Sequence, residues 1–183
     1  MKKLTLIFSL IIFTSIAYSQ KSFYDFTVKD INGKDFSLAS LKGKKVLVVN
    51  TASKCGLTPQ YRQLQELFLK YGGEKFTIIG FPANNFMQQE PGTNSEIEEF
   101  CEKNYGVKFP MMSKISVKGD DIHPLYQWLT SKSKNGVMDS SVKWNFQKYL
   151  IDESGNLVDV IDPRTKPDDE KIENWIKNTN GLF

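Results

Sequence analysis

The 183-residue sequence predicts a single α/β domain built on a mixed β-sheet. Three observations indicate this class. Residues 45–50 and 76–81 are continuous apolar runs, which is typical of strands buried on both faces. A pattern of helical period separates the two runs. Two further strand patterns near the C-terminus flank a turn, as expected of an antiparallel pair.

The first half of the sequence contains a hairpin and a β-α-β unit. Residues 23–38 alternate between apolar and polar side chains around Asn32-Gly33, which is a strong hairpin signal. The strand over 45–50 leads into a helix over 59–71, and the strand over 76–81 follows. A β-α-β unit implies parallel strands and a right-handed crossover. The apolar positions of the helix recur at helical spacing and include Leu64, Leu67, Phe68 and Tyr71.

The second half of the sequence completes the sheet and its helical cover. The expected elements are, in order, a loop over 82–93, a helix capped by Asn94 or Ser95, a short strand over 114–117, a helix with Pro124 at N1, strands over 146–151 and 157–161, and a last helix opened by Pro167. No repeat and no internal linker interrupts them. Residues 20–183 are therefore expected to form one domain.

Residues 1–19 form a separate unit. Lys2 and Lys3 precede an uncharged run over 4–17 and small residues, which is the layout of a secretory signal peptide. The run is short for the roughly 30 Å hydrocarbon core of a bilayer. We expect cleavage between Ser19 and Gln20, an exported protein in the periplasm or outside the cell, and no stable membrane association afterwards. An uncleaved N-terminal anchor is the alternative.

Composition argues against several classes of function. The sequence has 24 Lys and Arg against 21 Asp and Glu, and two of the cations belong to the export segment. The nearly neutral domain that remains argues against binding to nucleic acid or to membrane surfaces. Two cysteines and one histidine are too few for a Cys-rich or His-rich metal site, and no nucleotide-binding glycine loop or GxSxG motif occurs. We expect neither a metal nor a bound cofactor.

Cys55 is the first candidate for chemistry. It lies just beyond a buried strand and shortly before a helix, which is where open α/β sheets bind ligands. The helix N-terminus and the neighbouring Lys54 favour the thiolate, the nucleophilic form of the side chain. These grounds alone are equally compatible with an inert buried thiol. In an exported protein, Cys55 and Cys101 are also compatible with a structural disulfide.

Three separated motifs resemble those of the glutathione peroxidase family. Residues 50–58, NTASKCGLT, resemble the segment around its peroxidatic cysteine. FPANNF at 81–86 with QEPG at 89–92 resembles the second motif, and KWNF at 143–146 resembles the third. The resemblance covers roughly residues 24–178. It implies a thioredoxin-like fold, with the N-terminal hairpin added to a central mixed sheet, and the reduction of hydrogen peroxide and organic or lipid hydroperoxides in the response to oxidative stress.

The resemblance assigns the family's four catalytic roles to Cys55, Gln89, Trp144 and Asn145. It implies that the Cys55 thiolate attacks a peroxide oxygen and becomes sulfenic acid. The two amides and the indole N–H are hydrogen-bond donors, which suits them to stabilising the thiolate and the breaking O–O bond. Without the resemblance, Trp144 fits a core position, Asn145 a strand-end cap and Gln89 a solvated loop.

Cys101, within EFCEKNY at 99–105, resembles the resolving cysteine of thioredoxin-dependent members of the family. The resemblance implies a Cys55–Cys101 disulfide, formed in each turnover as the Cys101 helix unwinds locally and reopened by a thioredoxin-like protein. Direct turnover with glutathione is the alternative, in which Cys101 is only a core residue. A peroxide sensor that passes its disulfide to a partner protein needs the same residues and is a second alternative.

Two departures from the family pattern bear on these expectations. Ala83 stands where many relatives have a further cysteine, which leaves Cys101 as the single partner for Cys55 within the chain. Asn85 likewise replaces a common glutamine. The short chain between Trp128 and Trp144 resembles members that lack the oligomerisation loop of tetrameric relatives. We therefore expect a monomer.

Overall fold

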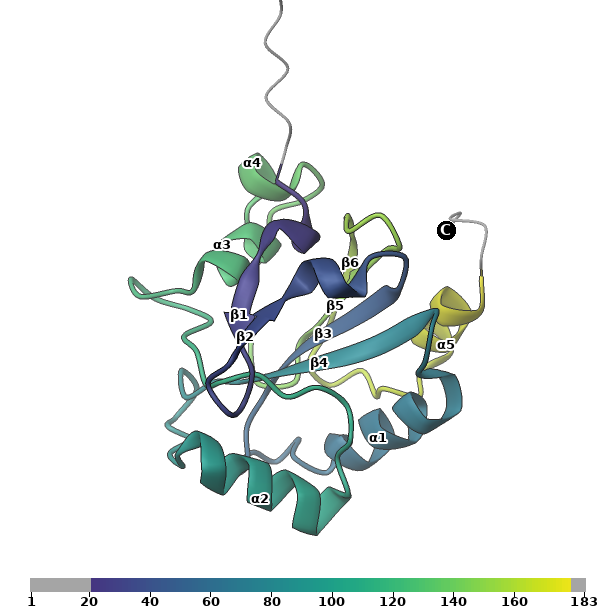
Figure 1. Ribbon diagram of the computed structural model, residues 1–183. Helices are drawn as coiled ribbons and strands as arrows, with labels where there is room; N and C mark the ends of the chain where they lie inside the picture. Colours follow the sequence, from purple (N-terminus) through teal and green to yellow (C-terminus); the bar gives the residue numbers. More distant parts are fainter. Residues whose placement is uncertain (1–20, 179–183) are drawn as a thin grey trace, which may run out of the picture.

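The computed structural model describes residues 21–178 and arranges them around a four-stranded mixed sheet (Figure 1). The spatial order of the strands is β4 (Phe76–Pro82), β3 (Lys45–Thr51), β5 (Lys148–Ile151) and β6 (Leu157–Ile161). β3 and β4 are parallel, whereas β5 is antiparallel to both β3 and β6. The mixed sheet and its parallel β-α-β unit are thus confirmed.

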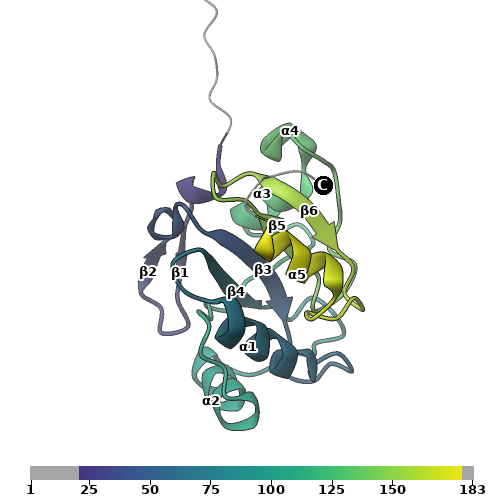
Figure 2. The same cartoon turned by 90° about the vertical axis from the view of Figure 1, so that its right-hand side faces the viewer.

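Helices and a hairpin cover the two faces of the sheet (Figures 1 and 2). Leu47 and Val49 of β3 share one apolar core with residues of three helices, whereas Val46 and Val48 enter a second core on the opposite face. Because alternate residues of β3 enter different cores, the strand is apolar almost throughout. The first core involves α1 (Gln60–Tyr71), α2 (Asn94–Tyr105) and α5 (Glu170–Lys177).

The second core is closed by the N-terminal segment and by α3 (Pro124–Thr130). The predicted hairpin is present, with β1 (Thr27–Lys29) paired antiparallel to β2 (Asp35–Ser37). Pro124 occupies the first turn of α3 as expected, and His123 Nδ1 accepts the N–H of Leu125. The remaining short helices are η1 (Phe23–Asp25), η2 (Leu38–Leu41) and α4 (Lys132–Asn135).

The N-terminus of α2 is fixed by a capping box. The Thr93 hydroxyl accepts the backbone N–H of Glu96, and the Glu96 carboxylate accepts the backbone N–H of Thr93. The N-cap is therefore Thr93, and the expectation of Asn94 or Ser95 was wrong. Asn94 Oδ1 accepts the N–H of Lys114 instead.

The strand expected between Lys114 and Val117 is absent. The bridges to neighbouring strands lie just before it, at residues 111 and 112. Lys114 and Val117 donate their backbone N–H groups to the side-chain oxygens of Asn94 and Asn85. Ile115 donates its N–H to the carbonyl of Pro82 at 3.0 Å, but side chains take the donors on both sides of it, so no regular strand ladder forms through the segment.

Two other elements begin later than predicted. Phe146 has a left-handed backbone with φ of 67°, so the regular extended strand begins only at Lys148. The last helix begins at Glu170, because the carboxylate of Asp169 caps it by accepting the N–H of Lys171. The proposed signal peptide and its cleavage point lie outside the described residues. No helix within residues 21–178 is long and apolar enough to cross a membrane.

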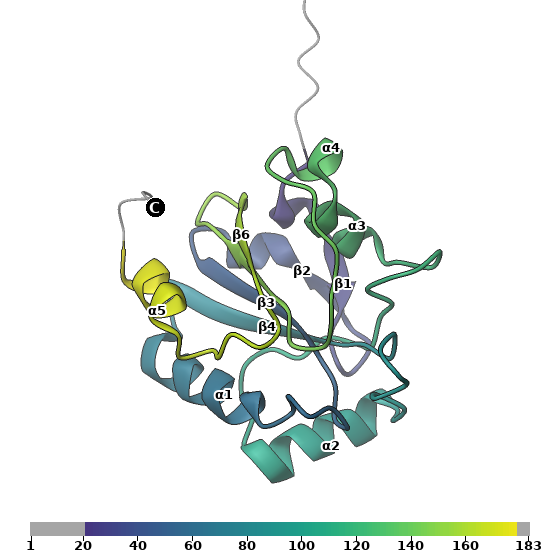
Figure 3. The same cartoon turned by 180° about the vertical axis from the view of Figure 1, so that it is seen from behind.

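The topology brings four segments to one edge of the sheet, which Figure 3 shows from behind. β3, β4 and β6 run in one direction and end at this edge, and the antiparallel β5 begins there. The loops after Thr51, Pro82 and Ile161 therefore meet the segment that precedes Lys148. Each of the three sequence motifs lies in one of these segments.

Candidate active site

Cys55 lies in the turn between β3 and α1. The N–H of Cys55 donates to Thr58 Oγ1, and the Thr58 hydroxyl donates to the carbonyl of Ala52, both at 2.9 Å. These bonds tie the turn to the end of β3. Cys55 Sγ accepts the N–H of Leu57 at 3.4 Å. This amide belongs to the turns that lead into α1, whose first N–H groups donate to the carbonyls of Leu57, Thr58 and Pro59.

The Cys55 thiol lines a pocket of about 630 Å³ that opens to the surface. Leu57 and Trp144 contribute apolar surface to this pocket, and Lys143 and Arg164 contribute positive charge. Cys55 is only 7% exposed. The pocket therefore connects this largely buried side chain to the surface.

Gln89 and Asn145 meet beside this turn, although they come from different loops. Asn145 Nδ2 donates to Gln89 Oε1 at 3.0 Å, and Asn145 is fully buried. The backbone carbonyl of Gln89 accepts the N–H of Lys54 at 3.0 Å. The loop after β4 is thus bonded both to the segment before β5 and to the residue preceding Cys55.

Trp144 is half-buried between the pocket and the loop after β4. Its ring lies 5.3 Å, centroid to centroid, from the ring of Phe86, and its carbonyl accepts Asn50 Nδ2 at 3.1 Å. The four predicted catalytic residues therefore lie on three adjoining segments. Within residues 21–178, the side-chain hydrogen bond among the four is the one between Gln89 and Asn145, whereas Cys55 and Trp144 share the pocket.

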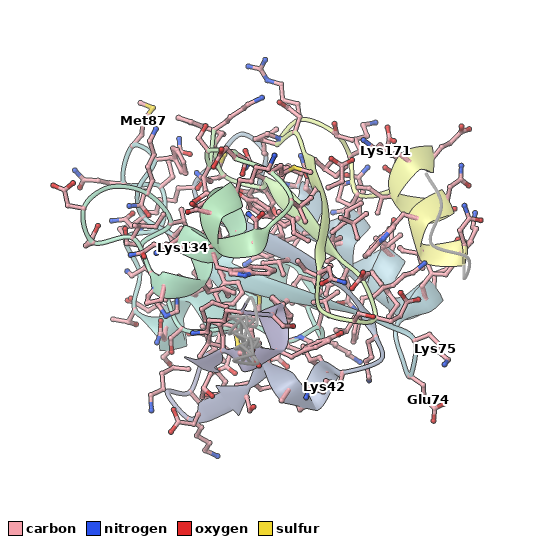
Figure 4. All side chains as sticks on the ribbon, turned by 90° about the horizontal axis from the view of Figure 1, so that it is seen from above. Lys42, Glu74, Lys75, Met87, Lys134 and Lys171 are labelled. Atoms are coloured by element: carbon pink, nitrogen blue, oxygen red, sulfur yellow. The ribbon has the colours of Figure 1, made fainter. Side chains whose placement is uncertain are left out.

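Three residues with side chains have left-handed backbones next to this set. They are Met87 (φ 50°), Gln88 (φ 52°) and Phe146 (φ 67°), which directly precede Gln89 or follow Asn145. A left-handed conformation costs about 1–2 kcal/mol for a residue with a Cβ, and such outliers concentrate at functional sites. Met87 is 78% exposed and points away from the molecule in Figure 4.

Cys101 lies apart from the Cys55 pocket, on α2. It is 2% exposed and lines a different pocket of about 280 Å³, together with Val107 and Phe109. Both cysteines are free thiols in this structure. Burial raises the pKa of the Cys101 thiol to about 11; the Tyr61 hydroxyl lowers it and the charge of Glu90 raises it further. Cys101 is therefore protonated and weakly nucleophilic at neutral pH.

Sequence patterns did not reveal the residues that support the pocket rim. The fully buried Lys148 donates from Nζ to the carbonyls of Pro163 at 3.2 Å and Thr165 at 2.6 Å. Gln60 Nε2 also donates to the carbonyl of Pro163, at 2.8 Å. These bonds hold the segment that places Arg164 in the pocket. A single lysine within an apolar strand pattern was the only signal available.

Comparison with known proteins identifies the family. A family model described as glutathione peroxidase matches residues 23–130. The chain belongs to the glutathione peroxidase family. It is 51% identical to the glutathione peroxidase homolog BsaA of Halalkalibacterium halodurans, over 80% of this chain and 92% of that protein. It is 49% identical to the glutathione peroxidase-like peroxiredoxin gpx1 of Schizosaccharomyces pombe, over 85% of this chain and 97% of that one.

Solved structures confirm the thioredoxin-like fold. The structure of Trgpx in its apo form matches with a TM-score of 0.66 and 41% identity, over 85% of this chain and 93% of that one. A thioredoxin-family thiol:disulfide interchange protein of Chlorobium tepidum matches with a TM-score of 0.55 and 25% identity, over 86% and 97%. The protein is thus a glutathione peroxidase-like enzyme that reduces hydroperoxides under oxidative stress.

The buried amine of Lys148 makes the stability of the fold depend on pH. Burial lowers the pKa of Lys148 to about 7, below its ordinary value of 10.5. Between these values the unfolded chain binds the proton and the folded chain does not, so this residue makes stability rise with pH across that window. We expect the free energy of unfolding of wild type, minus that of Lys148→Met, to increase by about 1–3 kcal/mol from pH 7 to 10.

Urea denaturation at several pH values measures this difference. Lys42→Met, on an exposed turn labelled in Figure 4, controls for the loss of a surface lysine. A constant difference between wild type and Lys148→Met would contradict the prediction.

Proposed function

We propose that Cys55 is the peroxidatic thiol and that Gln89, Trp144 and Asn145 complete its catalytic set. The observation that carries this proposal is the bond between Asn145 and Gln89, which joins two of the motif segments beside the pocket lined by Cys55 and Trp144. A fully buried asparagine held in this way presents its polar group in a fixed orientation. Preorganised donors cost little reorganisation during the reaction.

In the first step, the Cys55 thiolate attacks the terminal oxygen of a hydroperoxide. The S–O bond forms as the O–O bond breaks, which gives sulfenic acid and an alkoxide that is protonated to an alcohol or, from hydrogen peroxide, to water. The Leu57 N–H stabilises the sulfur anion before attack. The amides and the indole N–H stabilise the negative charge that develops on the departing oxygen.

In the second step, the Cys101 thiol attacks the Cys55 sulfur and releases water, which leaves a disulfide. The raised pKa of Cys101 supports this order of events, because a protonated thiol does not compete with Cys55 for peroxide. The two thiols lie in different pockets, so α2 must unwind locally before they meet. Ile97 and Cys101 are the buried residues of α2, and Phe100 and Tyr105 pack partly buried against the same core. Local unwinding must separate these side chains from that core.

A thioredoxin-like protein is the proposed reductant of this disulfide. Two relatives, from fission yeast and from Saccharomyces cerevisiae, are named glutathione peroxidase-like peroxiredoxins. The open pocket also suits organic and lipid hydroperoxides as well as hydrogen peroxide. A relative in Arabidopsis thaliana, 48% identical over 88% of this chain and 69% of that protein, is named a probable phospholipid hydroperoxide glutathione peroxidase.

Replacement of Asn145 tests the catalytic set. We expect Asn145→Ala and Gln89→Ala each to lower the rate constant for Cys55 oxidation by hydrogen peroxide by about 100-fold, because each breaks the bond between the two amides and removes a donor of the proposed catalytic set. Stopped-flow measurement of sulfenic acid formation reports this step alone. Gln63→Ala, which removes an amide on α1 away from the pocket, serves as the control. Equal rates in all the variants would exclude the assigned roles.

Replacement of Cys101 tests the resolving step and the donor. With thioredoxin, thioredoxin reductase and NADPH, we expect Cys101→Ser and Cys101→Ala to lose at least about 90% of steady-state peroxide turnover, since no intramolecular disulfide can form. A parallel assay uses glutathione and glutathione reductase. Equal turnover with glutathione in wild type and variants would show that Cys101 is a core residue. A single oxidation followed by a stable mixed disulfide with a partner would favour the sensor instead.

We propose further that the protein is exported and acts as a monomer. The signal-like layout of residues 1–19 supports export, and the short chain between Trp128 and Trp144 supports the monomer. Expression in a bacterial host should give a periplasmic or secreted protein whose N-terminal sequence begins at Gln20. Protein that still begins at Met1 and is found in the membrane fraction would indicate an uncleaved anchor. Light scattering of the purified protein measures its oligomeric state.

A further inference from the structure

Glu90 is a buried carboxyl group that the mechanism above does not use. It directly follows Gln89 and is 1% exposed. Its backbone N–H donates to Asn84 Oδ1 at 2.8 Å, and its carbonyl accepts Lys114 Nζ at 3.2 Å. Among residues 21–178, its buried Oε2 atom has no hydrogen-bond partner, although Ser53 lies close enough to lower the pKa of the carboxyl group. The loop therefore fixes the backbone of Glu90 and leaves one carboxylate oxygen without a hydrogen bond.

This carboxyl group faces a cavity between the two cysteine-bearing segments. The cavity has a volume of about 370 Å³. Ser53 and Lys54, which precede Cys55, line one part of it, and Ile97 and Phe100 of α2 line another. Ile97 lies one helical turn before Cys101 on the buried side of α2. The cavity therefore lies between the segments that the proposed unwinding of α2 has to bring together.

The thiol must lose its proton during this passage. With a pKa of about 11, Cys101 is almost entirely protonated at neutral pH, and the thiolate is the attacking species. Burial raises the pKa of Glu90 to about 6, so its carboxyl group is mostly ionised at neutral pH. The charged and titratable groups that face or influence it are Lys54, Lys114, Tyr61 of α1, and Glu96 and Cys101 of α2.

We propose that Glu90 is the general base that accepts the Cys101 thiol proton as this thiol attacks the Cys55 sulfenic acid. The proposal rests on the resolving role assigned to Cys101 above. The S–S bond forms, the S–O bond of the sulfenic acid breaks, and the departing hydroxide takes the proton from Glu90 and leaves as water. The Cys101 sulfur is oxidised and the Cys55 sulfur is reduced, so no external oxidant is needed. Glu90 returns to its carboxylate form.

The test separates the two chemical steps in one experiment. Reduced protein is mixed with one equivalent of hydrogen peroxide and quenched at intervals with dimedone, which traps sulfenic acid, and with an alkylating agent. Mass spectrometry then measures sulfenic acid and disulfide. For Glu90→Gln, which keeps the size of the side chain, we expect the ratio of the disulfide rate to the sulfenic acid rate to fall by roughly 100-fold.

The pH profile provides a readout that a purely structural role of Glu90 does not alter. In wild type, the rate of disulfide formation should rise as pH passes through about 6, because protonated Glu90 cannot accept a proton. This rise should be absent from Glu90→Gln, and Glu90→Asp should restore part of it. Glu98→Gln is the matched control. Glu98 is an acid on α2 that lines the Cys101 pocket but not the cavity beside Glu90, so this variant should behave as wild type.

Three results would overturn the proposal. The first is a wild-type disulfide rate and pH profile in Glu90→Gln. The second is an equal loss in both steps, which would indicate a structural role and would accompany a lower free energy of unfolding in urea. The third is the absence of any Cys55–Cys101 disulfide in wild type, which would remove the resolving role of Cys101 as well; the first two leave that role intact.

Discussion

The hydrogen bonds of Asn50 are the interaction on which the active site depends. Its carbonyl accepts the N–H of Phe146 at 2.6 Å, its N–H donates to the carbonyl of Gln147 at 3.3 Å, and its side chain bonds to the carbonyl of Trp144. These bonds extend the pairing of β3 and β5 beyond the regular strands. On its other side, Asn50 pairs with Phe81 of β4. One residue therefore sets the position of both segments that carry Asn145 and Gln89.

The same fold keeps two thiols in contrasting surroundings. Cys55 lies in a turn whose amide bonds to its sulfur, and it opens into a pocket. Cys101 is packed on a helix that buries only two of its residues. A buried thiol with a raised pKa is weakly nucleophilic while the helix that carries it stays folded. In the proposed mechanism this contrast accounts for the order of reaction, in which Cys55 meets peroxide first and Cys101 acts second.

The sequence predicts the sheet better than it predicts the environment of the site. The runs at 45–50 and 76–81 identify β3 and β4 because a strand buried on both faces must be apolar along its whole length. The expected strand at 114–117 does not form a regular ladder because the N–H groups of Lys114 and Val117 bond to asparagine side chains that are distant in sequence. The left-handed backbone of Phe146 gives no signal in composition. Such features depend on tertiary contacts, which local patterns do not encode.

The four catalytic positions were assigned by resemblance, and local pattern alone left each with an ordinary structural interpretation. The sequence did not single out Glu90 and Lys148, because charged residues are expected at the surface and both of these are buried. Burial raises the pKa of Glu90 and lowers that of Lys148, so both groups titrate near neutral pH. They act on different parts of the site, because Lys148 supports the rim of the Cys55 pocket and Glu90 faces α2. In the proposed mechanism the two titrations therefore act on different elements: that of Glu90 on the step at Cys101, and that of Lys148 on the stability of the segment at the pocket rim.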